Sequence, residues 1–196
     1  MEIKFYDIIM YGKFSDLFKW EVRDLPVGFE YKLYESYDDA VAWQRMWTDN
    51  GNFPSTEKAK EYFDRTFLPF EHELKRRMGF IINDKKEIVS TCSAWFKYNE
   101  KNEYMSIMHW LCTDDKYQGL GLAKAMFIYA INLYKDMPKT KYNFLHTQTT
   151  SYKAIELYGK LGYSIYYKPY FKYQTDVLGL DIIKELIDKK IYERII

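Results

Sequence analysis

The sequence contains little cysteine: Cys92 and Cys112 are the only two in a chain of 196 residues. They stand 20 positions apart and form no CxxC pair. Disulfide frameworks and cysteine-ligated zinc sites both need several cysteines at short spacings. The sequence therefore argues against a disulfide-rich domain and a cysteine metal site, and it favours a reducing compartment.

Long apolar runs and an excess of one charge are also missing. No stretch approaches the roughly 18 apolar residues that a membrane span needs. The first 14 residues show no basic leader and no apolar segment of signal-peptide length. Lys and Arg number 29 against 28 Asp and Glu, a formal net charge of +1, so nothing draws the whole chain to nucleic acid or a membrane surface. We expect a cytoplasmic protein without either partner.

Internal repeats and low-complexity linkers are absent too. A chain of this length supports one domain with a sizeable core. The sequence therefore predicts a single domain over 1–196, with its motif-bearing core at about 78–170 and a C-terminal helical extension at about 177–196.

Aromatic residues, by contrast, are abundant, at 19% of the chain with 20 tyrosines. This excess has two readings. One is a tyrosine-rich core and surface, and the other is an aromatic-walled pocket, since aromatic side chains also line ligand sites.

The pattern of apolar residues predicts a mixed α/β chain built around one sheet. Strands are expected at 29–36, 78–84, 88–98, 103–113, 142–149 and 163–173. Helices are expected at 37–50, 57–77, 122–136, 151–162 and 180–195. Ser36 is a candidate helix cap, and Pro69 should end or kink the second helix. The strand at 103–113 is almost continuously apolar, which predicts a central strand covered on both faces.

Two glycines, Gly119 and Gly121, stand between that strand and a helix. A helix N-terminus offers unpaired amides and the positive end of the helix dipole, so this junction is typical of an anion site. Lys124 adds a cation in the first turn. A P-loop is excluded because its GxxxxGK[ST] pattern is missing, and a dinucleotide fingerprint fails because Lys124 replaces its last glycine. Glycines serving only a tight turn remain the alternative.

Two motifs give the junction a more specific meaning. Residues 118–123, Gln-Gly-Leu-Gly-Leu-Ala, resemble the Arg/Gln-x-x-Gly-x-Gly/Ala signature of the GNAT superfamily of N-acetyltransferases. Residues 154–163, AIELYGKLGY, resemble that family's A-x-x-L-Y-x-x-x-G-[FY] motif. The resemblance covers about 78–170. It implies a GNAT-like α/β (α+β) fold, with a mixed, mostly antiparallel central sheet, helices on both faces, a splayed strand pair and a C-terminal helix.

The resemblance also implies acetyl-CoA as the acyl donor, with no metal. The positions that match the family's cofactor contacts are Leu111, Thr113, Gln118, Gly119, Leu120, Gly121, Leu122, Ala123, Lys124 and Ser151. The sequence departs from the family pattern at three places. Gln118 stands where Arg is commoner, Asp115 where Pro is usual, and Ser151 where many members have Asn, which puts that last contact in doubt.

Transfer of an acetyl group to an amine first requires a neutral amine. A lysine-like amine with a pKa near 10.4 costs roughly 4.6 kcal/mol to deprotonate at pH 7. His109 is the leading candidate for the base because histidine titrates near neutrality. Glu103 and His146 are the alternatives, and a water relay from any of the three fits equally well.

Two further roles are implied by the resemblance. The backbone amides of Leu111 and Thr113 would face the thioester carbonyl, and one such donor to an oxyanion is worth about 2.7–4 kcal/mol. Tyr158 occupies the position of the tyrosine that gives a proton to the leaving thiolate. An amphipathic core tyrosine is the alternative reading of Tyr158.

The acceptor is the least specified part. Trp43 and Trp47 lie at i and i+4 of the first helix, on a face that the family often turns to the acceptor, and His146 is a third candidate contact. The aromatic excess favours a small or partly apolar amine or a peptide amine. The predicted activity is acetyl transfer to a primary amine by direct attack. The alternatives are transfer of a larger acyl group and a non-catalytic CoA-binding sensor or scaffold. The apolar stripe of the C-terminal helix fits either core packing or a homodimer.

Overall fold

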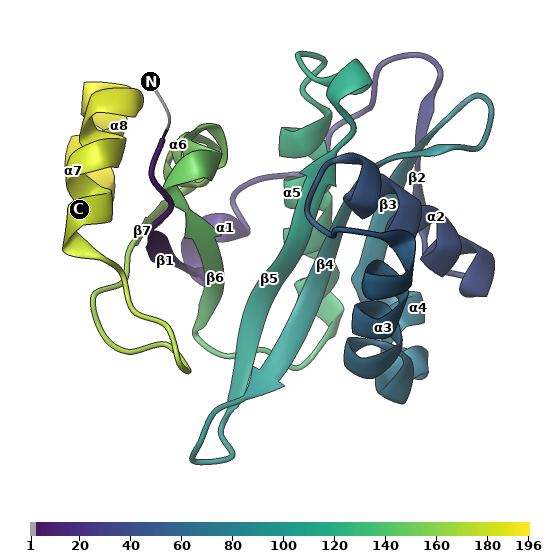
Figure 1. Ribbon diagram of the computed structural model, residues 1–196, viewed down its shortest axis with the longest axis horizontal. Coiled ribbons are helices and arrows are strands. Elements are labelled where there is room, and N and C mark those ends of the chain that lie inside the picture. Colours follow the sequence, from purple (N-terminus) through teal and green to yellow (C-terminus); the bar gives the residue numbers. More distant parts are fainter. Residues whose placement is uncertain (1–2) are drawn as a thin grey trace. The chain divides into compact units, whose positions relative to one another are not determined.

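The computed structural model describes residues 3–196 and divides into two compact units (Figure 1). The first unit consists of the chain up to Trp20, Phe96–Ile107 and Pro138–Ile196. The second consists of Glu21–Trp95 and Met108–Met137. Each unit is therefore assembled from stretches that are distant in the sequence.

Seven strands carry the fold. They are β1 (Asp7–Lys13), β2 (Phe29–Leu33), β3 (Met78–Asn83), β4 (Ile88–Tyr98), β5 (Tyr104–Thr113), β6 (Tyr142–Gln148) and β7 (Tyr163–Ile165). Their hydrogen-bonded order is β2-β3-β4-β5-β6-β1-β7. The pairs β2/β3, β3/β4, β1/β6 and β1/β7 are antiparallel. The pair β5/β6 is parallel and joins Ser106 with Asn143 and Ile107 with Phe144. The predicted mixed, mostly antiparallel sheet is confirmed; its splayed pair and the cover of both faces stay predictions.

The first helix of the second unit begins where the sequence predicts. Helix α2 (Tyr37–Asp49) starts with a capping box, in which the Ser36 hydroxyl accepts from the Asp38 amide at 3.3 Å and the Asp39 carboxylate accepts from the Ser36 amide at 3.4 Å. Pro69 lies in a short 3₁₀ helix, η1 (Leu68–Phe70). The expected long helix is therefore two helices, α3 (Thr56–Thr66) and α4 (Glu71–Arg77).

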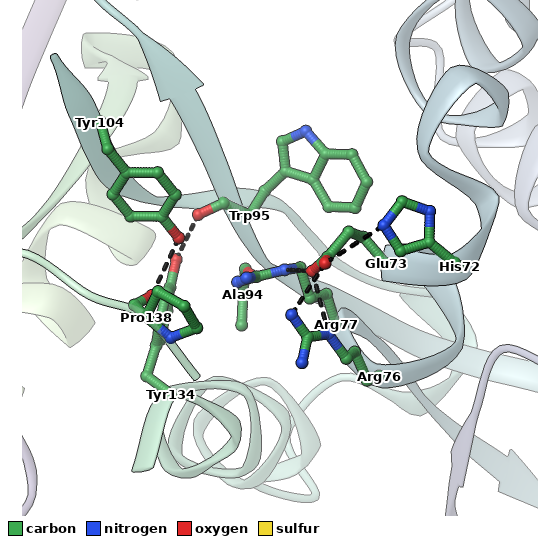
Figure 2. A network of polar contacts seen from close by, with 9 residues as sticks. All are labelled: His72, Glu73, Arg76, Arg77, Ala94, Trp95, Tyr104, Tyr134 and Pro138. Atoms are coloured by element: carbon green, nitrogen blue, oxygen red, sulfur yellow. Dashed lines mark hydrogen bonds and ion pairs between the residues drawn. The ribbon is translucent and has the colours of Figure 1, made fainter. Parts of the chain in front are cut away.

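A buried arginine connects α4 with β4. The Arg77 side chain is only 2% exposed, pairs with Glu73 and donates to the Ala94 carbonyl at 3.0 Å (Figure 2). Arg76 binds the same carboxylate from the surface, at 2.7 and 3.0 Å. A buried charge is tolerated only when it is paired and hydrogen-bonded. This network therefore fixes where α4 meets the sheet.

Helix α5 (Leu122–Leu133) packs on β3, and Gly79 lets it come close. A Cβ at Gly79 would lie 2.7 Å from Met126 Cε and 3.0 Å from Tyr129 Cε1. Beyond α5, the hydroxyl of Tyr134 donates to the Trp95 carbonyl at 2.5 Å (Figure 2). Contacts in the middle of the helix and just beyond its C-terminal end thus fix it within the second unit.

The first unit contains a strand that the sequence analysis missed. Strand β1 lies between β6 and β7, and Ile8, Ile9 and Met10 are completely buried. Three consecutive buried residues give no period-2 alternation, which is why pattern reasoning overlooked the strand. The short helix α1 (Phe14–Leu17) follows it and was also missed.

Three other expectations need correction. The predicted C-terminal helix is two helices, α7 (Val177–Leu186) and α8 (Lys189–Ile195), because Asp188 caps a new start. Strand β7 ends at Ile165, well before Pro169. Strand β5 is central in the sheet order, as predicted, but only Ser106–Met108 are buried and the rest is half-buried, so the strand is not covered along its whole length. Among the described residues, no helix is long and apolar enough to cross a membrane.

Helix α6 (Tyr152–Leu161) packs closely against α8, and this contact makes a stability prediction. A Cβ at Gly159 would lie 2.7 Å from Cγ2 of both Ile191 and Ile195. These branched methyl groups cannot swing away easily, so Gly159→Ala should lower the free energy of unfolding by about 1–3 kcal/mol. The loss should appear although Ala favours a helix by about 1 kcal/mol over Gly.

Urea or thermal unfolding measures the effect. Lys153→Ala, on the exposed face of the same helix, is the matched control and should change stability by less than about 0.5 kcal/mol. A Gly159→Ala protein as stable as the parent would contradict the close packing of α6 on α8.

Candidate functional site

The glycine turn of the second unit lies between η2 (Asp115–Tyr117) and α5. Gly119 and Gly121 have φ angles of 81° and 78°, a region that other residues rarely adopt. A Cβ built at either position would meet no atom within 4 Å. The backbone conformation therefore requires the glycines, packing does not, and the space above the exposed turn is open.

The start of α5 has the donors that an anion needs. Its N-cap is Gly121, which has no side chain to cap the helix. The Ala125 amide donates to the Gly121 carbonyl at 3.0 Å and is the first with an acceptor within the helix, so the amides of Leu122 and Ala123 lie ahead of the helical ladder. Lys124 places a positive charge in the same turn. The second unit thus contains the features on which the predicted anion site rests, and anion binding stays a prediction.

The turn is held from its N-terminal side. The Tyr117 ring packs on Phe29, with centroids 5.8 Å apart, and its hydroxyl accepts from Asn83 Nδ2 at 3.0 Å. Gln118 Nε2 donates to Asp115 Oδ1 at 2.5 Å. The Gln118 side chain is therefore engaged within the turn, which leaves the backbone as the part that meets a ligand.

Strand β5, which leads into the turn, is irregular at Trp110. Trp110 has a φ of 56°, in the left-handed region that costs a non-glycine residue about 1–3 kcal/mol. A positive φ inside a strand turns the following peptide groups away from the regular ladder. Leu111 and Thr113, the predicted oxyanion donors, come directly after this point, and Ser90 Oγ lies 2.8 Å from Thr113 Oγ1.

Trp110 lies among a group of rings that we call the aromatic cluster. Its members come from α2, α3 and the loops beside them and from β5; they are Trp43, Trp47, Phe53, Tyr62, Phe67 and Trp110. Centroid distances from Trp110 are 4.5 Å to Trp47, 5.6 Å to Trp43 and 5.4 Å to Phe53. The aromatic cluster accounts for part of the aromatic excess. One side of the cluster belongs to the core, and the other side is half-exposed.

Two of the three residues predicted to contact the acceptor, Trp43 and Trp47, lie on the buried side of the aromatic cluster. Trp43 is 0% and Trp47 5% exposed. Direct contact between Trp43 and an acceptor would need the cluster to open. Phe53, Tyr62 and Trp110 are half-buried and so present more ring surface.

His109 adjoins the aromatic cluster. Its Nε2 lies 3.0 Å from the hydroxyl of Tyr62, and its ring centroid lies 6.0 Å from that of Phe67. His109 and the glycine turn belong to the same unit. The sequence did not single out Tyr62, since nothing in the chain pairs a residue of α3 with one of β5.

Glu103, the rival base, lies in the turn between β4 and β5. Asn99 Nδ2 donates to its carboxylate at 2.7 Å, and the Glu103 amide donates to Asn99 Oδ1 at 2.8 Å. This exposed side chain closes a hairpin. The contacts of Glu103 are therefore those of a turn-forming residue.

The first unit contains the remaining predicted residues. Tyr158 lies on α6, is 7% exposed and has its ring 6.1 Å from that of Tyr163. Ser151 precedes α6 but makes no capping hydrogen bond through its side chain. The placement of Tyr158 on a helix that follows β6 is the one its motif predicts.

His146 is part of a small cluster on β6. Its Nε2 lies 2.7 Å from Asp7 Oδ1, and the Tyr173 ring stacks on it at 4.1 Å with an interplanar angle of 29°. The sequence analysis missed both partners. Asp7 was missed because β1 was not recognised, and Tyr173 lies in an irregular loop.

Sequence comparison now assigns the fold. A profile described as the acetyltransferase (GNAT) family matches residues 16–163. The chain belongs to the GNAT acetyltransferase family. No curated protein matches it.

Solved structures resemble this GNAT chain at low sequence identity. A GCN5-related N-acetyltransferase from Sphaerobacter thermophilus has a TM-score of 0.61 at 15% identity, covering 83% of this chain and 49% of that one. A tandem GNAT protein from the clavulanic acid biosynthesis pathway has a TM-score of 0.61 at 11% identity, covering 82% and 50%. Glucosamine-6-phosphate N-acetyltransferase from Arabidopsis thaliana has a TM-score of 0.52 at 15% identity, covering 74% and 97%.

These likenesses concern the fold. This GNAT chain spans about half the length of the first solved structures that it matches. Among residues 3–196, no three His, Cys, Asp or Glu side chains gather in a way that could hold a metal ion.

The glycine turn makes a binding prediction for this GNAT protein. Gly119→Ala should weaken acetyl-CoA binding at least about tenfold, equivalent to about 1.4 kcal/mol, because it strains the turn and puts a methyl group into the open space. Isothermal titration with acetyl-CoA measures the loss.

Gly51→Ala is the matched control. Gly51 also has a positive φ, 73°, and also has nothing within 4 Å of a built Cβ. Both variants should lose about 1–2 kcal/mol of stability from backbone strain, but only Gly119→Ala should lose affinity. If the two variants bound acetyl-CoA with equal affinity, the glycine turn would not be part of the acetyl-CoA site.

Proposed function

We propose that this GNAT protein transfers an acetyl group from acetyl-CoA to the primary amine of a small molecule or peptide, by direct attack in a ternary complex. One observation carries the proposal. In a chain of this family, an exposed turn with two positive-φ glycines and open space above them leads into a helix N-terminus.

The residues of the turn fit the diphosphate of coenzyme A. The amides of Gly119, Gly121, Leu122 and Ala123 would donate to its oxygens, and Lys124 would add charge. Acetyl-CoA, when bound, supplies a thioester whose acetyl carbon an amine can attack. Since backbone groups make this site, the departure from Arg at Gln118 costs little.

Direct attack is favoured over an acetyl-cysteine intermediate. Burial, with a smaller effect of Asp115 and Asp114, raises the pKa of the Cys112 thiol to about 12. Burial also raises the pKa of Cys92, which is 0% exposed. A thiol that stays protonated at neutral pH is a poor nucleophile, and the chain has no third cysteine.

We assign the base to His109. It shares its unit with the glycine turn and lies beside the half-buried rings of the aromatic cluster, whereas the Glu103 carboxylate is engaged in a hairpin turn. His146, oriented by Asp7, is the alternative base or an acceptor contact. The amides of Leu111 and Thr113 would donate to the oxyanion, and Tyr158 would give its proton to the leaving sulfur.

The acceptor should meet the half-buried side of the aromatic cluster. Phe53, Tyr62 and Trp110 offer ring faces there, and aromatic faces attract cations and cover apolar groups. An amine carried on a small or partly apolar body suits such a surface.

A ligand panel tests the proposed function. Acetyl-CoA and coenzyme A should raise the melting temperature of the protein, because a ligand that binds only the folded state stabilises it, while NADH should not. A library of primary amines with acetyl-CoA should then release free thiol for at least one acceptor. Propionyl- and succinyl-CoA in the same assay define the acyl preference.

Two outcomes would contradict the proposal. Stabilisation by NADH alone would indicate a different cofactor. Stabilisation by acetyl-CoA without thiol release, for any amine, would indicate a binding protein.

The variant Tyr158→Phe tests whether Tyr158 gives its proton to the leaving sulfur. Removing the hydroxyl should lower kcat by about 10²-fold or more, since proton transfer by a positioned side chain contributes about 10²–10⁴-fold. The KM for acetyl-CoA should change little. Tyr152→Phe, on the same helix, is the control and should retain the parent's turnover; parental turnover in Tyr158→Phe would make Tyr158 a packing residue.

A further inference from the structure

The glycine turn is exposed, and the residues on either side of it are not. Residues 118–121 are all exposed, and a Cβ at Gly119 or Gly121 would meet no atom within 4 Å. Tyr117, before the turn, is half-buried, and Leu122, after it, is only 1% exposed. The conformation of the turn therefore depends on how these two flanking residues are held.

Tyr117 is held by a residue from another part of the second unit. Its ring packs on Phe29, and its hydroxyl accepts a hydrogen bond from Asn83 Nδ2 at 3.0 Å. Asn83 is the last residue of β3, 34 positions earlier in the chain, and is 5% exposed. A buried amide at the end of a strand thus fixes the side chain that precedes the turn.

The Asn83 side chain is fully used in hydrogen bonds. Its Oδ1 accepts from the backbone amides of Lys85 and Glu87, each at 3.0 Å. Its Nδ2 donates to Glu87 Oε2 at 2.7 Å and to the Tyr117 hydroxyl. An asparagine amide offers two N–H donors and two acceptor lone pairs, so none is left over.

These partners also fix which way round the amide lies. A flipped amide would set its N–H groups against the backbone amides of Lys85 and Glu87, and its oxygen against the Glu87 carboxylate. Neither arrangement makes a hydrogen bond. Asn83 is therefore the donor to Tyr117, and one side chain holds both the β3–β4 hairpin and the approach to the glycine turn.

An anchored turn has a consequence for binding. A ligand that meets a turn already in its binding conformation does not have to order it, and this raises affinity without adding a contact. The start of η2 is anchored as well, because the Asp114 amide donates to the Val89 carbonyl of β4 at 2.9 Å. The path from the sheet to the first glycine is thus held at two successive points, Asp114 and Tyr117.

We infer that Asn83 is a positioning residue for the acyl donor, which acts through Tyr117 to hold the glycine turn in the conformation that binds the diphosphate of acetyl-CoA. The inference rests on the proposed function and adds a residue to its donor site. Asn83, Tyr117 and the turn all belong to the second unit. The effect of Asn83 therefore falls on the affinity for acetyl-CoA and not on the rate of acetyl transfer from the bound donor.

The variant Tyr117→Phe tests the link between Asn83 and the turn. It removes the hydroxyl and keeps the ring that packs on Phe29. Isothermal titration should show an affinity for acetyl-CoA about fivefold lower, equivalent to about 1 kcal/mol, the usual net worth of one hydrogen bond. Without ligand, ¹⁵N relaxation should show lower order parameters for the amides of Gly119 and Gly121, since the turn becomes more mobile.

The matched control is Tyr31→Phe. Tyr31 is also in the second unit, its ring stacks on that of Tyr129 at 4.4 Å, and its hydroxyl donates to the Arg23 carbonyl at 3.0 Å. This variant should keep the wild-type affinity and order parameters. If Tyr117→Phe lowered the melting temperature as Tyr31→Phe does and left affinity and order parameters unchanged, Tyr117 would be a stability residue and the inference would be overturned.

A double-mutant cycle tests whether Asn83 acts through Tyr117. Asn83→Ala should weaken acetyl-CoA binding, and the double variant with Tyr117→Phe should bind no more weakly than Asn83→Ala alone, because the hydroxyl has already lost its partner. Additive losses would contradict this route. Since Asn83 also holds the hairpin, Asn83→Ala can fail to fold, and the comparison of Tyr117→Phe with Tyr31→Phe then decides the inference.

Two further measurements separate the inference from the proposed function. With an amine that the wild type accepts, Tyr117→Phe should raise the KM for acetyl-CoA about fivefold and keep kcat within about twofold. A wild type and a Tyr117→Phe variant with equal affinity for acetyl-CoA overturn the inference alone. A wild type that binds no acetyl-CoA overturns both, and one that binds it without releasing thiol to any amine overturns acetyl transfer and leaves the role of Asn83 in binding.

Discussion

The site in the second unit depends on one backbone constraint, the positive φ of Trp110. A bulky residue stays in that conformation only when its neighbours determine its position. The rings of Trp43, Trp47 and Phe53 and the Tyr62 hydroxyl do so here. The aromatic cluster therefore stabilises the irregularity of β5, and this in turn sets the directions of His109 before it and Leu111 after it.

Each unit contains residues with a proposed role. The second contains the glycine turn, His109 and the aromatic cluster, and the first contains Tyr158 and the His146–Asp7 pair. The proposed site for the acyl donor depends mainly on the backbone. It needs positive φ angles at two glycines and amides at the start of a helix. Side chains make up the proposed acceptor part, which consists of the half-buried rings and the His109 imidazole.

This difference explains what the sequence could predict. Capping at Ser36, the break at Pro69 and the glycine turn follow from local rules that act within a few residues, and the structure confirms all three. Strand β1 was not predicted because its continuous burial arises from its neighbours in the sheet and not from an alternation of apolar and polar residues. The contact between Tyr62 and His109 was not predicted for the same reason. The two residues are 47 positions apart in the sequence, and only folding brings them together.

The difference between a donor site made of backbone groups and an acceptor site made of side chains also bears on how acceptors change within the family. A donor site made of amides would survive almost any side-chain replacement that keeps its glycines, and proteins with 11–15% identity do resemble this fold. An acceptor surface made of rings changes with every substitution in it. The acceptor surface proposed here could not change freely, however, because it would include Trp110, whose own positive φ depends on the neighbouring rings. Substitutions that alter the acceptor should therefore collect at Phe53, on the half-exposed side, and spare the buried Trp43 and the Tyr62 hydroxyl on which Trp110 depends.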